Sequence, residues 1–298
     1  ANWVTVSALG PAPPAGGADL PLEQALTRMQ NHWEHHLANV LPDAPDLIVL
    51  PEACDRFPAH TPEQRIEYYR HRGDRMRDFF AEIAREHRCH IAYSAARELP
   101  DGTWRNSTQI LDCTGAVSGV YNKNHVVIEE TTKYGILCGR AATVTDCDFG
   151  RVGCAICFDL NFDEIRRQYT RRKPDLILFS SMYHGGLMQR VWAYTCRAHF
   201  VGAVAGDQCT ILSPLGEIVA AGTNYHSYVT ARINLDCALV HLDYNRPRLQ
   251  KLKQAYGRDV CITDPGHLGS LLVSCNREER TVNDLIREFE IEPLDDYW

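Results

Sequence analysis

Apolar positions along the chain follow two periods, and each predicts a different kind of element. Short apolar or alternating runs are typical of buried β-strands. Such runs lie at 4–9, 46–50, 90–95, 106–112, 117–121, 152–156, 175–179, 201–205, 209–212, 218–221 and 229–235. Apolar residues at helical spacing between Leu22 and Val40 predict a first amphipathic helix. Further helices are expected over 61–89, 162–171 and 189–200.

The order of these elements predicts the fold class. Turn signals at Asp101-Gly102 and at Pro214-Leu215-Gly216 join neighbouring strands into hairpins. Strands mixed with hairpins and helices are typical of an α/β fold with mixed sheets and helices outside. We find no Ser/Gly-rich linker and no repeat of fixed period, so a single domain over 1–298 is expected. Residues 236–298 predict a tail with one or two helices and irregular chain.

Composition and charge narrow the class of partner. Hydrophobic residues make up 45% and charged residues 23% of the 298 positions, which is ordinary for a soluble globular protein. The formal net charge is −7. The densest basic stretch, 166–173, is interrupted by uncharged residues and is typical of a solvated helix face. A nucleic-acid partner is therefore not expected.

Targeting signals and cysteine usage suggest a compartment. No run of roughly eighteen apolar residues predicts a membrane span. The stretch Ala1-Asn2-Trp3 lacks the basic start of a signal peptide. Twelve cysteines are scattered along the chain, and a chain of this size can bury a core without disulfides. Most of them are predicted to be reduced and buried, which favours the cytoplasm.

Three predicted strands end in a side chain with chemical capacity. The stretch "LIVLPEAC" (47–54) leads to Glu52, "VSGVYNKNH" (117–125) to Lys123, and "VGCAICFD" (152–159) to Cys157. In α/β sheets, sites gather beyond the carboxyl ends of strands. A carboxylate, an ammonium and a thiol that meet there have complementary roles. Lys123 would lower the pKa of the thiol, Glu52 could move its proton, and the ammonium would stabilise an oxyanion.

Simpler interpretations of single residues stay open. Any one cysteine is by default a buried, inert thiol. Cys154-x-x-Cys157 could be half of a redox or zinc site, but no second pair with matching spacing is present. His32, His35 and His36 fall on a predicted solvated helix face, and the zinc-protease order His-Glu-x-x-His is missing. A metal site is therefore not expected.

Six pieces of the sequence together resemble the nitrilase superfamily of carbon–nitrogen hydrolases. They are "DLIVLPEAC" (46–54), "RNSTQILDCTGAVSGVYNKNHV" (105–126), "DFGRVGCAICFDLNFDE" (148–164), "PDLILFSS" (174–181), "RAHFVGAVAGD" (197–207) and "SPLGEIVAAG" (213–222). They occur in the family's order within 4–235. The resemblance implies a four-layer αββα sandwich of two mixed β-sheets with helices outside. It also implies that 236–298 are a C-terminal extension at a subunit interface.

A Glu–Lys–Cys triad is a further implication of the resemblance. Residue by residue, Glu52 matches the general base, Lys123 the catalytic lysine and Cys157 the nucleophile. Family members often carry a second glutamate shortly after the lysine. Glu129 and Glu130 both stand there, and Glu130 is preferred.

Further residues are expected around this triad by analogy with the family. The backbone N–H of Phe158 would be the second oxyanion donor. The loop after "DLILFSS" would line the pocket and offer Tyr183 and His184 to the substrate. Arg190 or Arg197 could pair with a substrate carboxylate, although nothing in the sequence fixes either in the pocket.

The residues around the nucleophile favour one group of substrates. Cys157-Phe158-Asp159 lacks the Cys-Trp-Glu of nitrilases proper and resembles the amidase and carbamoylase branches. Where the family often has Arg and Pro after the nucleophile, this chain has Asn161 and Asp163, which leaves pocket shape and subunit contacts open. The expected activity is hydrolysis of an amide or N-carbamoyl compound without metal or organic cofactor.

Other functions stay open at this point. A nitrilase or an acyl-transferring amidase is the nearest alternative. A catalytically inactive binding or scaffold protein with the same fold is an alternative from a different class. The expected partners are a small amide or carbamoyl substrate and further copies of the chain in a homodimer or larger homo-oligomer. No membrane partner is expected.

Overall fold

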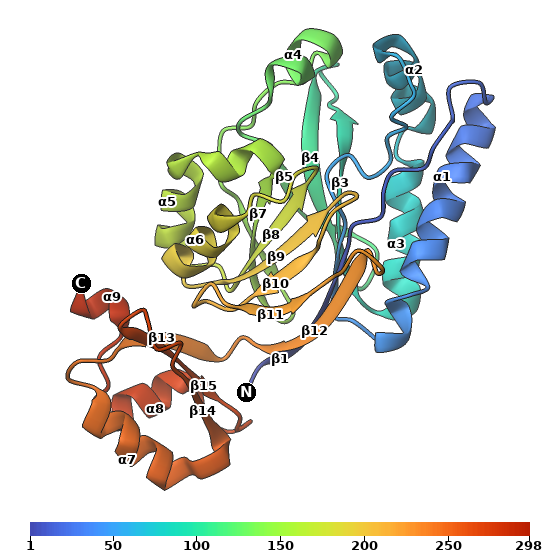
Figure 1. Ribbon diagram of the computed structural model, residues 1–298. Coiled ribbons are helices and arrows are strands. Elements are labelled where there is room, and N and C mark those ends of the chain that lie inside the picture. Colours follow the sequence, from blue (N-terminus) through green and yellow to red (C-terminus); the bar gives the residue numbers. More distant parts are fainter.

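Two six-stranded sheets face each other at the centre of the molecule (Figure 1). The computed structural model describes all residues from 1 to 298. One sheet has the order β12-β1-β2-β3-β4-β5, with β1 (Trp3–Leu9), β2 (Leu47–Val49), β3 (His90–Glu98), β4 (Trp104–Leu111), β5 (Val117–Asn122) and β12 (Tyr228–Asn234). The other has the order β11-β10-β9-β8-β7-β6, with β6 (Val144–Cys147), β7 (Gly150–Ile156), β8 (Leu176–Ser181), β9 (His199–Val204), β10 (Thr210–Leu212) and β11 (Ile218–Ala221).

Helices cover the outer face of each sheet (Figure 1). The first sheet carries α1 (Leu22–Leu37), α2 (Pro62–Arg72) and α3 (Arg75–His87), and the second carries α5 (Asp163–Arg172) and α6 (Leu187–Cys196). The strands alternate their apolar side chains between the two faces. In β8, Leu176 and Leu178 join the core between the sheets, whereas Ile177 and Phe179 join the core under the helices. The predicted four-layer αββα sandwich of two mixed sheets is confirmed.

Strand direction brings two strand ends to one edge of the first sheet. β1, β2 and β3 are parallel, and so are β7, β8 and β9. β4 is antiparallel to both β3 and β5, so β5 runs in the same direction as β2. The carboxyl ends of β2 and β5 therefore lie at the same edge of the first sheet.

Two predicted helices end earlier than their apolar pattern suggested. Thr61 caps α2 as expected, because its hydroxyl accepts a hydrogen bond from the Gln64 N–H at 3.2 Å. The expected single helix over 61–89 is wrong, since Gly73 has φ +50° and separates α2 from α3. The predicted helix over 189–200 ends at Cys196, because Arg197 adopts a left-handed conformation with φ +57°. The sequence did not predict β6 or α4 (Ile128–Tyr134).

The C-terminal residues form a small layered unit beside the sandwich (Figure 1). A three-stranded sheet has the order β13-β15-β14, with β13 (Cys237–His241), β14 (Val260–Thr263) and β15 (Ser270–Cys275). It packs with α7 (Arg246–Tyr256) and α8 (Val282–Glu288) around its own apolar core, and α9 (Leu294–Tyr297) follows. The expectation of one or two helices with irregular chain missed this sheet.

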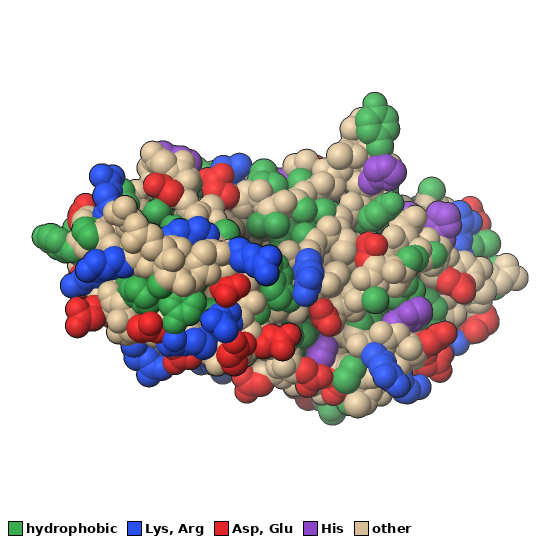
Figure 2. Space-filling view, turned by 90° about the horizontal axis from the view of Figure 1, so that it is seen from below, with side chains coloured by type: hydrophobic (Ala, Val, Ile, Leu, Met, Phe, Trp, Pro, Cys, Tyr) green, Lys and Arg blue, Asp and Glu red, His purple; other side chains and the backbone are tan.

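Three further features concern the surface charge, the helices and the cysteines. On the face seen in Figure 2, acidic and basic side chains are interspersed. None of the helices combines the length and the apolar character that are needed to cross a bilayer. None of the twelve cysteines forms a disulfide.

Candidate active site

A cavity of about 190 Å³ lies at the edge where β2, β5 and β7 end. Glu52, Lys123, Glu130 and Cys157, which the sequence predicted as a group, all line it. Its other lining residues are Ala53, Arg56, Arg65, Tyr69, Ala96, Asn106, Val127, Glu129, Tyr134, Ile136 and Met182. The cavity therefore draws on both sheets and on the segments that follow their strands.

A buried lysine is the centre of this cavity. Lys123 is 1% exposed, and its Nζ donates hydrogen bonds to Glu52 Oε1 at 2.8 Å and to Glu130 Oε2 at 2.7 Å. The Asn106 amide donates to both carboxylates, to Glu52 Oε1 and to Glu130 Oε1, each at 2.8 Å. An ammonium has three N–H donors, so one donor of Lys123 stays available to a ligand.

Burial and charge set the protonation of the lysine. Burial alone would lower the pKa of Lys123, but the two carboxylates beside it outweigh burial and raise this pKa above its ordinary value. Lys123 therefore stays charged at neutral pH. A buried ammonium between two carboxylates is costly to desolvate, and its hydrogen bonds compensate for that cost.

The thiol at the end of β7 is protonated at neutral pH. Burial, the first cause, and the charge of Glu52 raise the pKa of Cys157 to about 12, while Lys123 acts in the opposite direction. Lys123 lowers the thiol pKa as expected, but burial and Glu52, which the sequence did not weigh, raise it by more. A nearby carboxylate and loss of solvent outweigh the ammonium. Cys157 needs a base before it can act as a nucleophile.

Two residues beside the cavity hold strained backbone conformations. Cys157 has φ +48° and Ala53, next to Glu52, has φ +45°. Non-glycine residues seldom adopt positive φ, and such strain persists only where surrounding contacts enforce it. Cys157 begins the short 3₁₀ helix Cys157–Asn161, so the turn directs its side chain to the cavity instead of continuing the strand.

Asp159 fixes the turn after β7 to the segment after β5. Its carboxylate is fully buried and accepts hydrogen bonds from the Ile156 N–H at 3.0 Å and the Tyr121 hydroxyl at 2.7 Å. It also accepts from the backbone N–H groups of Asn124 at 3.1 Å and His125 at 2.7 Å. These bonds hold the segments on either side of Cys157 and Lys123 in one arrangement.

The two neighbouring glutamates after the lysine have different surroundings. Glu130 turns inward to Lys123 and also accepts from the Val127 N–H at 2.9 Å. Glu129 is exposed and pairs with Lys133 at 2.8 Å, one turn further along α4. The helical geometry of α4 therefore separates two residues that the sequence could not tell apart.

The residues predicted around the triad lie in several places. Phe158 follows Cys157, and its N–H lies in the first turn of the short helix, where the helix supplies no acceptor. Tyr183 and His184 do not line the cavity, whereas Met182, which precedes them, does. Arg190 is exposed, and Arg197 forms an ion pair with Asp295 at 3.0 Å in the C-terminal unit. Neither arginine lines the cavity.

Several lining residues were missed by sequence reasoning. Asn106 lies in β4, whose sequence pattern predicts only a strand, and its contact with two carboxylates is visible only in space. Arg56 and Arg65 follow Glu52 in a loop and in α2, and they join the cavity through the fold of that segment. No group of three or more His, Cys, Asp or Glu side chains has an arrangement that suits a metal ion.

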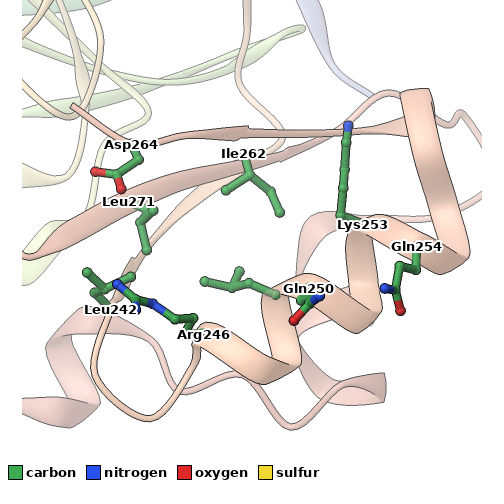
Figure 3. Close-up of a pocket in the computed structure, with 9 residues that line it drawn as sticks. Leu242, Arg246, Gln250, Lys253, Gln254, Ile262, Asp264 and Leu271 are labelled. Carbon is green, nitrogen blue, oxygen red and sulfur yellow. The ribbon is translucent and has the colours of Figure 1, made fainter. Parts of the chain in front are cut away.

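A larger cavity of about 470 Å³ lies in the C-terminal unit (Figure 3). It is an open groove between α7 and the sheet, and its apolar lining residues are Leu242, Leu249, Ile262 and Leu271. Charged side chains such as Arg246, Lys253 and Asp264 surround it. It contains no buried ion pair and none of the predicted site residues.

Comparison with known proteins identifies the family. Residues 21–238 match the family described as Carbon-nitrogen hydrolase. The chain belongs to this family. The resemblance to the nitrilase superfamily that the motifs indicated is thereby confirmed, and curated carbon–nitrogen hydrolases with similar sequences include several omega-amidases.

Individual carbon–nitrogen hydrolases are distant relatives. The chloroplastic omega-amidase of Arabidopsis thaliana is 28% identical over 136 residues, which is 39% of this chain and 37% of that protein. The deaminated glutathione amidase of Bos taurus is 22% identical over 64% of this chain and 67% of its own length. The matched regions of the omega-amidases of Arabidopsis thaliana and Xenopus tropicalis, 37% and 42%, cover less than half of each protein.

Solved structures of the family share the fold. The NitFhit protein of C. elegans has a TM-score of 0.66 at 14% identity and covers 97% of this chain and 98% of its own. A mutant of the Nesterenkonia amidase from the nitrilase superfamily has a TM-score of 0.65 at 16% identity, over 85% of this chain and 97% of its own. At these identities the similarity establishes the architecture alone.

Proposed function

We propose that this carbon–nitrogen hydrolase cleaves the C–N bond of a small amide or N-carbamoyl compound through a thioester on Cys157. The observation that carries the proposal is the position of Lys123 between Glu52 and Glu130 in the cavity that Cys157 also lines. A protonated thiol, a carboxylate and a charged donor in one cavity are the groups that acyl transfer needs. The amidase names of the relatives agree with this reaction type.

In the proposed first step, Glu52 takes the thiol proton of Cys157. Both hydrogen bonds to Glu52 end on Oε1, which leaves Oε2 to accept that proton. The thiolate attacks the carbonyl carbon, and the electron pair of the C=O bond moves to oxygen. The third donor of Lys123 and the N–H of Phe158 stabilise this oxyanion. One such donor typically contributes about 3 kcal/mol to the lowering of the barrier.

In the proposed second step, the tetrahedral intermediate collapses. The C=O bond forms again, the C–N bond breaks, and Glu52 delivers its proton to the leaving nitrogen. Water then loses a proton to Glu52 and attacks the thioester, and the sulfur leaves with that proton. Glu130 would hold Lys123 and Asn106 in place during both steps, since it bonds to each of them.

The size of the cavity limits the substrate. The cavity volume of about 190 Å³ lies below the roughly 300–1,000 Å³ of typical ligand pockets. This favours a substrate with few carbon atoms around the scissile bond. The sequence Cys157-Phe158-Asp159, without the Cys-Trp-Glu of nitrilases proper, supports an amide or carbamoyl group over a nitrile.

A substrate panel with ammonia detection tests the proposal. Wild-type protein and the variants Cys157→Ala, Glu52→Gln and Lys123→Ala are assayed on small amides, N-carbamoyl compounds and nitriles. We expect ammonia from amides or carbamoyl compounds with wild type only, and an acyl group on Cys157 in mass spectra. Full activity in any variant would refute the triad, and ammonia from nitriles alone would favour a nitrilase.

An inactive binding or scaffold protein is the alternative from another class. It predicts no turnover on any member of the panel and no acyl group on Cys157 in mass spectra. An acyl-transferring amidase predicts a hydroxamate when hydroxylamine is added during turnover.

We further propose that the chain forms at least a homodimer through its C-terminal extension. The last residues, Tyr297 and Trp298, are 39% and 75% exposed and lie side by side in the chain, so they offer apolar surface to a second copy. Light scattering of the whole chain tests this expectation, and a monomeric mass at micromolar concentration would contradict it.

A further inference from the structure

We propose that Arg56 and Arg65 form a subsite for a carboxylate, so that the preferred substrate carries a carboxylate a few bonds from the scissile C–N bond. This inference rests on the proposed hydrolysis at Cys157 and specifies the substrate class of that same cavity. Both guanidinium groups belong to residues that line the cavity together with Cys157.

The two arginines reach the cavity from neighbouring segments. Arg56 lies in the loop that follows β2, four positions after Glu52, and Arg65 lies near the start of α2. Both side chains are partly buried. Their like charges interact, since burial and then the charge of Arg65 lower the pKa of Arg56. A guanidinium stays charged despite such a shift, so this wall of the cavity carries two positive charges.

Neither arginine has a carboxylate partner within the chain. Arg65 donates to the Tyr134 hydroxyl at 2.9 Å and to the Phe57 carbonyl at 3.4 Å, and it packs over the Tyr134 ring. The buried Nε atoms of Arg56 and Arg65 have no hydrogen-bond partner. By contrast, Arg72 at the end of the same helix pairs with buried Asp55 at 2.7 Å.

The carboxylates of the cavity are already bound to other groups. Glu52 and Glu130 share Lys123 and Asn106, and Glu129 pairs with Lys133. The charge of the two arginines is therefore balanced by no side chain at hydrogen-bond distance. Two like charges in a partly desolvated site attract an anion strongly.

A carboxylate fits this wall better than a larger anion. A planar carboxylate can take two parallel hydrogen bonds from one guanidinium. The cavity of about 190 Å³ also has to hold the scissile amide and the atoms between the two groups. A phosphonate in the same position occupies more of that volume, so we expect it to be accepted less well.

Matched substrates measure this subsite directly. Straight-chain primary amides that end in a carboxylate, a phosphonate or a methyl group are compared at equal chain length. The readout is the ratio of kcat/KM for the carboxylate amide to kcat/KM for the methyl amide. Arg56→Met and Arg65→Met are expected to lower this ratio by roughly ten- to a hundredfold each, mainly through KM, because a charge-assisted hydrogen bond is lost. Arg56→Lys, which keeps the charge, should retain part of the preference.

Arg70→Met is the matched control on the same helix. Arg70 is 61% exposed and contacts Glu98 at 3.6 Å, and it does not line the cavity. Its substitution should leave the ratio within about twofold of wild type. A wild-type ratio near one, a ratio that Arg56→Met and Arg65→Met leave unchanged, or a preference for the phosphonate would overturn the inference.

A binding experiment separates this inference from the proposed function. Butanoate and butan-1-ol are tested for protection of Cys157 against iodoacetamide in wild type and in Arg56→Met. Protection by butanoate only, lost in Arg56→Met, supports the subsite even if no amide is hydrolysed and the proposed function fails. Equal protection by both compounds would overturn the subsite while leaving amide hydrolysis intact.

Discussion

Two cavities of this chain, the groove of the C-terminal unit and the cavity that Cys157 lines, differ in size and in chemistry. The groove of the C-terminal unit is larger, at about 470 Å³ against about 190 Å³, and it is open and apolar with charged side chains around it. The smaller cavity contains a lysine that is 1% exposed and a glutamate that is 4% exposed. Burying charged groups costs free energy, and such groups often mark functional sites. The buried lysine and glutamate therefore favour the smaller cavity as the candidate site. Of these two cavities, volume alone would have selected the groove, which has no buried charge.

The largest expected difference between the two regions is the loss of turnover when one cysteine of each region is replaced. Cys157→Ala should lower kcat/KM for a small amide by at least about four orders of magnitude, because the nucleophile is lost. Cys261→Ala, at an exposed position in the C-terminal unit, should leave turnover unchanged. Steady-state ammonia release checks both variants. Comparable losses in the two would remove the distinction between the cavities.

Replacement of the buried lysine should affect both turnover and stability. Lys123→Met is expected to lower kcat by about two to three orders of magnitude, since one oxyanion donor is lost. It should also lower the free energy of unfolding by about 3 kcal/mol, because Glu52 and Glu130 stay buried without their cation. Lys253→Met in the C-terminal groove is the control. Urea titration and kinetics measure the two effects, and a stable, active Lys123→Met would contradict the assignment.

The pH dependence of alkylation should reveal the environment of the nucleophile. Because the folded-state pKa of Cys157 is raised to about 12, its thiolate fraction should rise roughly tenfold per pH unit from pH 8 to 11. A thiol peptide should level off above about pH 8.5. The same shift stabilises the folded state below about pH 8.5, and this contribution is lost as pH rises toward 12. An alkylation rate that levels off near pH 8 would show that Lys123 outweighs burial and Glu52.

The neighbouring glutamates provide a comparison within the smaller cavity. Glu130→Gln should lower kcat/KM by about tenfold or more, because it removes a charge-assisted bond to Lys123. Glu129→Gln should cost less than about threefold, since it removes only an exposed pair with Lys133. Measurement of kcat/KM for both variants on one amide tests this difference. The reverse order would assign the role to Glu129.

The smallest expected effect on turnover comes from the core of the C-terminal unit. Leu252 is fully buried between α7 and the small sheet. Leu252→Ala should lower the free energy of unfolding by about 3 kcal/mol and change kcat/KM by less than about twofold. Thermal unfolding and kinetics measure these quantities. A large loss of activity in the folded variant would show that the two regions are coupled.

The sequence was most informative where a pattern repeats. Strand alternation and helical spacing located most of the two large sheets and their helices, because burial on one face imposes a period. The small C-terminal sheet was missed because its apolar pattern is weak: β14 has only four residues, and of these only Val260 is buried. Gly73 ends a helix inside an otherwise continuous helical pattern, and only its positive φ shows this.

The sequence predicted which residues form the candidate site but not the environment of their side chains. Glu52, Lys123 and Cys157 follow strands, and motifs single them out. The raised thiol pKa depends on burial and on Glu52, which residue order does not specify. Tertiary contacts bring three further residues into the cavity. Asn106 comes from β4, and Arg56 and Arg65 come from the segment after β2. Residue spacing therefore carried no signal for them.

The buried carboxylate of Asp159 has a mechanical consequence. It joins the segment after β5, which belongs to one sheet, to the turn after β7, which belongs to the other. A sliding motion of one sheet over the other would have to break these bonds before it could displace the sulfur from the ammonium. The alignment of Cys157 with Lys123 is thus coupled to the interface between the sheets. Substitutions in that interface, far from any ligand, should alter turnover by tilting one layer.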